Sequence, residues 1–71
     1  LYGGFDGMDI IRVVSRRALQ LLKPGGFLVV EHAETQGQLV ADLFQTDGWE
    51  NIQIHQDLTN RDRSVSATKA L

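Results

Sequence analysis

Residues 22–31, which read LKPGGFLVVE, decide the fold that this sequence predicts. Lys23, Pro24 and the glycine pair after them are typical of a helix end, because proline cannot continue a helix and glycine permits the turn that follows. The next four residues, Phe27–Val30, are apolar without alternation and rich in β-branched side chains. Such a run predicts a strand buried on both faces, as in a parallel sheet flanked by helices.

The segments on either side of this strand give an α/β order. Upstream, Asp6 is suited to cap a helix, and apolar residues then recur at helical spacing on one face: Ile10, Ile11, Val14, Ala18, Leu21 and Leu22. Downstream, the pattern predicts a second helix from about Gln36 to Thr46, then strands at Ile52–His55 and Val65–Thr68 that can form an antiparallel hairpin. The Phe27–Val30 strand then lacks a neighbour on at least one side, so the predicted sheet is incomplete.

Length and composition exclude several classes of protein. The 71 residues form one small domain at most, and the absence of cysteine excludes a disulfide framework or a thiolate metal site. A net charge of -2 gives no reason to expect nucleic acid or an anionic membrane as a direct partner. The longest apolar run is too short to span a bilayer, and the first residues do not read as a signal peptide, so a cytoplasmic location is expected.

Two segments resemble a known family. Residues 22–31 resemble the helix-to-fifth-strand junction that class I S-adenosylmethionine-dependent methyltransferases share. Residues 1–9, LYGGFDGMD, resemble more specifically the L-x-G-G-x-D-G-L-D segment that follows an Asn-Pro-Pro-Tyr motif in the HemK/PrmC glutamine methyltransferases. Glu31 with Gln36-Gly37, and Asp57-Leu58 followed by residues 61–63, match C-terminal signatures of that family. The resemblance covers essentially the whole chain.

This resemblance implies that residues 1–71 are the C-terminal part of a Rossmann-like methyltransferase domain whose cofactor-binding N-terminal part is absent. It also implies that the last strand, near Val65–Thr68, inserts antiparallel between Phe27–Val30 and Ile52–His55. One departure is visible, because Glu31-His32-Ala33 stands where the family often has Glu-Ile-Gly. Glycine accepts a positive φ at no cost and Ala33 does not, which puts the loop geometry at this point in question.

The implied activity is methylation of a glutamine side-chain amide in peptide-chain release factors, with S-adenosylmethionine as cofactor. The glycine-rich cofactor turn and the Asn-Pro-Pro-Tyr motif are both missing, so the sequence predicts no catalytic, cofactor-binding or metal-binding residue in this chain, and no activity for it alone. The residues that can form the rim of a substrate cleft are Gly3, Gly4, Asp6, Gly7 and Glu31. A capped loop and a hydrogen-bonded loop carboxylate explain the same residues without a site.

Other features have two interpretations. Arg12, Arg16 and Arg17 suit an acidic partner, such as a release factor or its bound RNA, but also a solvated helix face. His32 with Glu31 and Glu34 has no standard metal-ligand spacing, which favours a solvated loop. Residues 61–63 can pair within the hairpin or fold back toward the substrate side, and His55 is expected to face solvent.

Two alternative functions remain open for the parent protein. One is another class I methyltransferase, acting on adenine N6 or on a small molecule. The other is a truncated, non-catalytic module that associates with itself through the exposed sheet edge.

Overall fold

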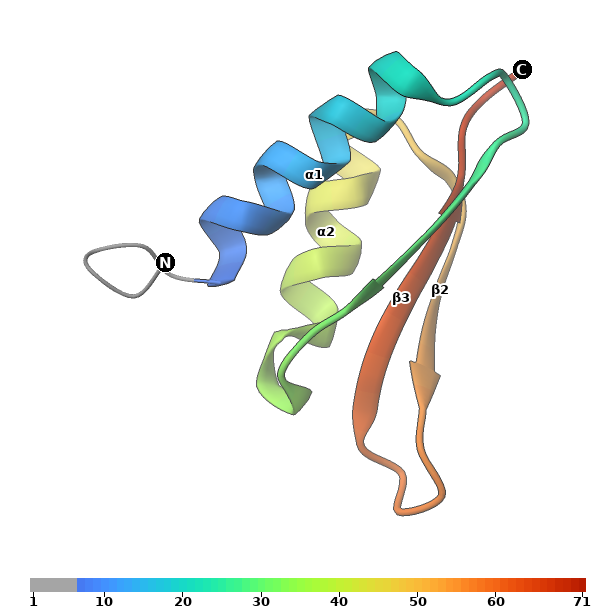
Figure 1. The fold of residues 1–71 in the computed structure, drawn as a ribbon. Helices are drawn as coiled ribbons and strands as arrows, with labels where there is room; N and C mark the ends of the chain where they lie inside the picture. The colour runs from blue at the N-terminus through green and yellow to red at the C-terminus, as the bar shows by residue number, and fades with distance from the viewer. Residues whose placement is uncertain (1–6) are drawn as a thin grey trace.

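A computed structural model describes residues 7–71 of the chain. The elements follow in the order α1 (Gly7–Leu21), β1 (Phe27–Glu31), the short 3-10 helix η1 (Glu34–Gln36), α2 (Gly37–Asp47), β2 (Glu50–Gln56) and β3 (Asp62–Thr68). Both helices lie on the same side of the sheet (Figure 1). The predicted α/β class, the two helices and the three strands are therefore confirmed for this part of the chain.

The three strands form one sheet in the order β1-β3-β2, and both neighbouring pairs are antiparallel. The last strand therefore lies between the other two, as the family resemblance implied. Phe27 pairs with Thr68, and Glu31 pairs with Ser64, so β1 is in register with β3 along its whole length. Since β1 and β2 are both antiparallel to β3, they run in the same direction on either side of it.

The prediction that β1 is buried on both faces is wrong for this chain. Phe27 is 60% exposed and Val29 is 52% exposed, whereas Leu28 and Val30 are partly buried. The reason is that the helices cover only one face of the sheet and that β1 is an edge strand. The run of apolar side chains in β1 therefore has cover for only half of its members among residues 7–71.

The core lies between α2 and the sheet. Val40 and Phe44 of α2 are fully buried, as is Val65 of β3, while Trp49 just after α2 is 4% exposed. The rings of Phe44 and Trp49 have centroids 5.9 Å apart in a tilted arrangement, within the range in which aromatic pairs attract. Gly48 ends α2 in a left-handed conformation, with φ of 93°, which a residue with a Cβ adopts only at a cost.

Helix α1 buries a different stripe from the one that its apolar pattern predicted. Met8, Ile11 and Ser15 are buried against the rest of the molecule, and Ala18, Leu19 and Leu22 are partly buried. Ile10, Val14 and Leu21, which the sequence placed on the same face, are 39%, 37% and 80% exposed. The apolar face of α1 is thus wider than the surface that α2 offers it. Neither helix in the described residues is long and apolar enough to cross a membrane.

Candidate functional site

The carboxyl end of β1 is the position at which α/β sheets place functional groups. Glu31 ends this strand and has an exposed side chain. The backbone N–H of His32 donates to the carbonyl of Arg63 at 3.1 Å, which extends the pairing of β1 and β3 one residue past the strand. The end of β1 is therefore fixed to the start of β3, and Glu31 is presented from a rigid position.

The backbone of Gly37 lies close to the side chain of Asp62 at this end of the molecule. A Cβ on Gly37, the first residue of α2, would lie 2.6 Å from a carboxylate oxygen of Asp62 and 3.0 Å from its Cβ. Asp62 begins β3, and its other carboxylate oxygen accepts a hydrogen bond from the side-chain amide of Gln56 at 3.0 Å. Glycine at position 37 lets α2 start directly against the hairpin. The Gln36-Gly37 signature thus has a packing reason here.

His32 follows the strand and was not predicted as a functional residue. Its Nδ1 lies 2.6 Å from the carbonyl oxygen of Ala33, so Nδ1 carries the proton and donates. The Nε2 atom is buried and has no hydrogen-bond partner among residues 7–71. Among the described residues, no three histidines or carboxylates are grouped as a metal site would require. Ala33 itself has φ of -67°, so the substitution of alanine for the family's glycine causes no backbone strain.

The structure places two of the five predicted rim residues. Gly7 is the first residue of α1 and Glu31 the last of β1, while Gly3, Gly4 and Asp6 lie outside the described residues. Helix α1 and strand β1 run in opposite directions in space, so the start of α1 and the end of β1 lie toward the same end of the molecule (Figure 1). That arrangement is the one a shared cleft rim needs, and the assignment of these residues to a rim stays a prediction.

The β2–β3 hairpin is fixed by one carboxylate. An oxygen of Asp57 accepts hydrogen bonds from the hydroxyl and the N–H of Thr59, at 2.6 and 2.8 Å, and from the N–H of Arg61 at 3.1 Å. Its other oxygen is 2.7 Å from Nε of Arg63. The Thr59 hydroxyl, the Arg63 guanidinium and the Arg61 N–H hold the pKa of Asp57 well below its ordinary value of 3.8. Of the two interpretations left open for residues 61–63, the structure shows pairing within the hairpin, and the partner of Arg63 is Asp57.

A serine and a histidine meet on the face of the sheet away from α2. Nε2 of His55 on β2 lies 2.7 Å from the hydroxyl of Ser66 on β3. The side chain of His55 is exposed, as predicted, but Ser66 is only 3% exposed. A nucleophilic serine needs room for an attacking substrate beside its hydroxyl. The pair is therefore a cross-strand contact and provides no catalytic centre.

Sequence reasoning missed the role of Asp57 and the buried nitrogen of His32. The spacing of Asp57 and Thr59 is the signal that predicts the first, because a turn aspartate commonly accepts a hydrogen bond from a backbone N–H two residues on. No pattern in the sequence indicates the second, since burial of one ring nitrogen depends on contacts far from His32 in the chain.

Comparison with known proteins identifies close relatives. The release factor glutamine methyltransferase of Streptomyces coelicolor is 50% identical over 72 aligned residues, which cover 100% of this chain and 26% of that protein. The protein of the same name from Synechocystis is 44% identical, covering 94% of this chain and 23% of the relative. That of Cereibacter sphaeroides is 42% identical, covering 90% and 23%. The chain spans about a quarter of the length of these relatives.

Two other comparisons give no match. No protein-family model matches the chain. No solved structure matches it either.

Proposed function

Because the chain is homologous to about a quarter of the length of the release factor glutamine methyltransferases, we propose that it is the C-terminal part of such an enzyme. The parent protein would transfer a methyl group from S-adenosylmethionine to the side-chain amide nitrogen of a glutamine in a peptide-chain release factor. The homology carries this proposal, and it agrees with the family that residues 1–9 and 22–31 resemble.

The incomplete cover of β1 supports a place in a larger sheet. One edge of β1 pairs with β3, and no described strand pairs with the other. On the uncovered face, Phe27 and Val29 keep more than half of their surface exposed. A Rossmann-like sheet would supply a parallel strand at this free edge and a layer of structure over this face. We infer that the missing three-quarters of the parent supplies both.

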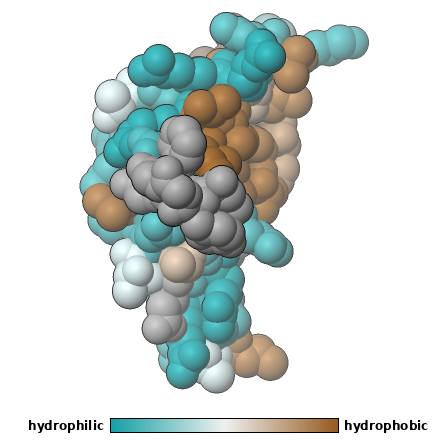
Figure 2. All heavy atoms as spheres, turned by 60° about the vertical axis from the view of Figure 1, so that its left-hand side comes forward, coloured by the Kyte–Doolittle hydropathy of each residue, from teal (hydrophilic) through white to brown (hydrophobic). Residues whose placement is uncertain are grey.

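The exposed apolar side chains of α1 support the same arrangement. Ile10, Val14 and Leu21 lie beside the buried stripe and remain in solvent. Figure 2 shows a continuous area of hydrophobic surface on the side of the molecule that carries α1. Single exposed apolar residues are ordinary on a protein surface, but a row of them beside a free strand edge is typical of a surface that another structure covers.

The positions of the start of α1 and the end of β1 support a proposal for the part that this chain plays in the reaction. Its start of α1 and its end of β1 would form one wall of the substrate cleft, with Gly3, Gly4, Asp6, Gly7 and Glu31 at the rim. Bound S-adenosylmethionine supplies the methyl carbon, and the residues that bind it and orient the acceptor amide would belong to the remaining part of the parent. The chain alone would then position substrate without transferring a methyl group.

A second function has one observation in its favour. No strand among residues 7–71 pairs with the outer edge of β1, so another strand can pair with the backbone N–H and C=O groups there. The chain would then act as a self-associating module without catalytic activity. A second methyltransferase class, acting on adenine N6 or a small molecule, would use the same fold, and only its substrate would differ.

A hybrid protein tests the proposal. In this hybrid, residues 1–71 replace the matching quarter of the Streptomyces coelicolor release factor glutamine methyltransferase. We expect the hybrid to fold and to methylate purified release factor with a rate within about tenfold of the intact relative, since core and wall residues tolerate conservative exchange. The 71-residue chain alone should show no methyl transfer and no heat of binding with S-adenosylhomocysteine.

The controls separate the alternatives. The relative with the same quarter deleted should be inactive, which shows that this region is required. A folded hybrid that transfers no methyl group to release factor, while the intact relative does, would contradict the proposal. Methylation of an adenine oligonucleotide in place of release factor would favour the second methyltransferase class. Stable oligomers of the chain together with an inactive hybrid would favour the self-associating module.

A further inference from the structure

Helix α1 carries more positive than negative charge. Three of its seven lysines and arginines, Arg12, Arg16 and Arg17, lie on this helix, and all three side chains are exposed. Asp9 is the only acid of α1. The chain as a whole has a net charge of -2, so α1 forms a basic surface on an acidic molecule. Such a separation of charge is typical of a surface that attracts a negatively charged partner.

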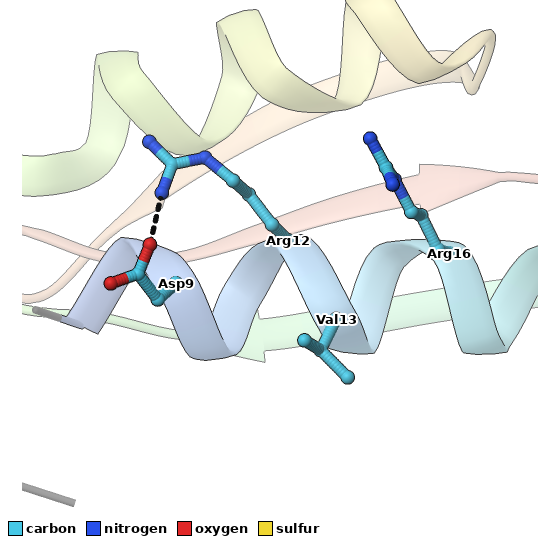
Figure 3. A pocket seen from close by; sticks show the side chains of 4 residues that line it. All are labelled: Asp9, Arg12, Val13 and Arg16. Carbon is cyan, nitrogen blue, oxygen red and sulfur yellow. Dashed lines mark hydrogen bonds and ion pairs between the residues drawn. The ribbon is translucent and has the colours of Figure 1, made fainter. Parts of the chain in front are cut away.

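An open concavity lies against this helix. It has a volume of about 400 Å³ and is lined by Asp9, Arg12, Val13 and Arg16. Figure 3 shows the side chains of Arg12 and Arg16 extending to the same side of α1, as their spacing of four residues requires. Val13 contributes an apolar side chain that is 61% exposed.

The two arginines of the concavity differ in their ion pairing within the described residues. Nη1 of Arg12 is 2.7 Å from a carboxylate oxygen of Asp9, so its charge is largely balanced within the helix. Arg16 makes no hydrogen bond or ion pair with any residue from 7 to 71. Its guanidinium therefore presents all of its N–H donors to whatever occupies the concavity.

We propose that this concavity binds an acidic segment of a protein partner, with Arg16 receiving a carboxylate and Val13 contacting an adjacent aliphatic side chain. A guanidinium offers two parallel N–H groups that match the two oxygens of a carboxylate. Since Asp9 balances one of the two cations, the described lining of the concavity has a single net positive charge. That charge suits one carboxylate beside an apolar residue.

A nucleic acid fits the same surface less well. Nucleic-acid sites commonly make about 6–10 phosphate contacts, and phosphates lie in a regular row of negative charge. Residues 7–71 offer one unbalanced cation in the concavity, and Asp9 would lie beside the phosphates. The proposal concerns a surface of this chain, and it does not depend on the proposed methyl transfer.

Anisotropy of labelled probes tests the proposal with the 71-residue chain. One probe is a fluorescein-labelled peptide of alternating glutamate and leucine, and the other is a fluorescein-labelled oligouridylate of equal charge. The peptide should bind saturably, and more weakly as salt screens the contact. The variant Arg16→Gln should weaken peptide binding by about fivefold to tenfold, as loss of a charge-assisted bidentate contact does. Arg12→Gln should have a smaller effect.

Arg17→Gln is the matched control. It removes the same charge from the same helix, but Arg17 does not line the concavity. It should change binding by less than about twofold, as exposed charges outside a contact do. Circular dichroism and Trp49 fluorescence show that each variant is folded.

Three outcomes would overturn the proposal. Equal loss in Arg16→Gln and Arg17→Gln would show an attraction that depends on overall charge alone. Tighter binding of the oligouridylate than of the peptide would assign the surface to nucleic acid. A folded chain that binds neither probe saturably would show that the concavity has no acidic ligand.

Discussion

Ser15 lies on the buried face of α1 and has no exposed surface. Its hydroxyl donates to a carboxylate oxygen of Asp47 at 2.7 Å and accepts the indole N–H of Trp49 at 2.8 Å. Two parts of the chain more than thirty positions apart in sequence, Ser15 and the segment at Asp47 and Trp49, are therefore joined at one oxygen atom. A buried polar group of this kind stabilises a fold only while every partner is present.

The substitution Ser15→Ala should lower the free energy of unfolding by about 1–3 kcal/mol, because it leaves the buried N–H of Trp49 without an acceptor. Urea titration of the chain measures this change. In the background of Trp49→Phe, the same substitution should cost much less, because the unpaired donor is gone. Ser64→Ala serves as the control and should change little. Equal costs of Ser15→Ala in both backgrounds would contradict the hydrogen-bond interpretation.

At the scale of the residue, sequence predicted the types of side chain well and their contacts poorly. The periodicity of α1 correctly marked Ile11, Ala18 and Leu22 as inward. It could not show that Ser15 occupies the middle of that stripe. A lone serine gives no sign that its hydrogen-bond partners are Asp47 and Trp49, more than thirty residues later. Nor could it show that Val14 stays in solvent, since that depends on how much of α1 the rest of the molecule covers.

Helix α1 ends against the last strand of the sheet. The ammonium of Lys69, just after β3, donates to the carbonyl oxygens of Leu19 and Leu22 at 2.5 and 2.7 Å. The last turn of α1 has no basic residue of its own. A cation at the helix carboxyl end is stabilising because it satisfies free carbonyls and opposes the helix dipole. Lys69 thus supplies from the sheet the cap that the helix lacks.

We expect Lys69→Met to destabilise the chain by about 1–2 kcal/mol, with the loss concentrated in the last turn of α1. Methionine keeps the aliphatic length and removes the three donors. Amide hydrogen exchange should show faster exchange near Leu22 and little change in the first turn of α1. Lys23→Met removes an exposed charge nearby and is the control. Uniformly faster exchange across α1 would contradict a capping role.

The β2–β3 hairpin should respond to acid through Asp57. Its pKa is depressed in the folded state, so the carboxylate stabilises the folded hairpin fully above the ordinary pKa of 3.8. This stabilisation is lost progressively as the pH falls below that value toward the lower pKa of the folded state. Asp57→Asn should remove this part of the pH dependence while lowering stability at neutral pH.

Thermal unfolding of both proteins between neutral pH and strongly acidic pH measures this difference. The plots of unfolding temperature against pH for the chain and for Asp57→Asn should converge at low pH. There Asp57 is protonated in both the folded and the unfolded state of the unsubstituted chain. Parallel curves would show that other carboxylates carry the acid sensitivity. The positions of the helices and strands were predictable within a few residues, but this acid response was not, because it depends on four hydrogen bonds formed inside one turn.

At the scale of the whole molecule, residues 7–71 cover one face of the sheet with helices and leave the other face without such a layer. The prediction of an α/β sheet with a missing neighbour is supported by the free edge of β1, and the order of the strands was predictable from the family resemblance. The extent to which each face is covered could not be predicted from the sequence. A run of apolar residues reflects the burial of that segment in the complete protein. For Phe27 and Val29, that burial would involve structure outside these 71 residues.

The substitution Val29→Ser tests this explanation in two settings. In the 71-residue chain, where Val29 is 52% exposed, it should cost less than about 1 kcal/mol. In the hybrid, where the parent would cover this face, it should cost about 1–3 kcal/mol more. Leu39→Ser on α2, at a side chain 55% exposed, is the control and should cost the same in both. Equal costs of Val29→Ser in both settings would contradict cover by the parent.

The position of β3 between β1 and β2 also has a consequence for biosynthesis. A ribosome makes the two outer strands before the strand that joins them, so neither can form its ladder while residues 62–68 are still inside the exit tunnel. Helices α1 and α2 need only local contacts and can form earlier. The nascent chain would therefore expose the edges of β1 and β2 that pair with β3 until residues 62–68 have left the exit tunnel.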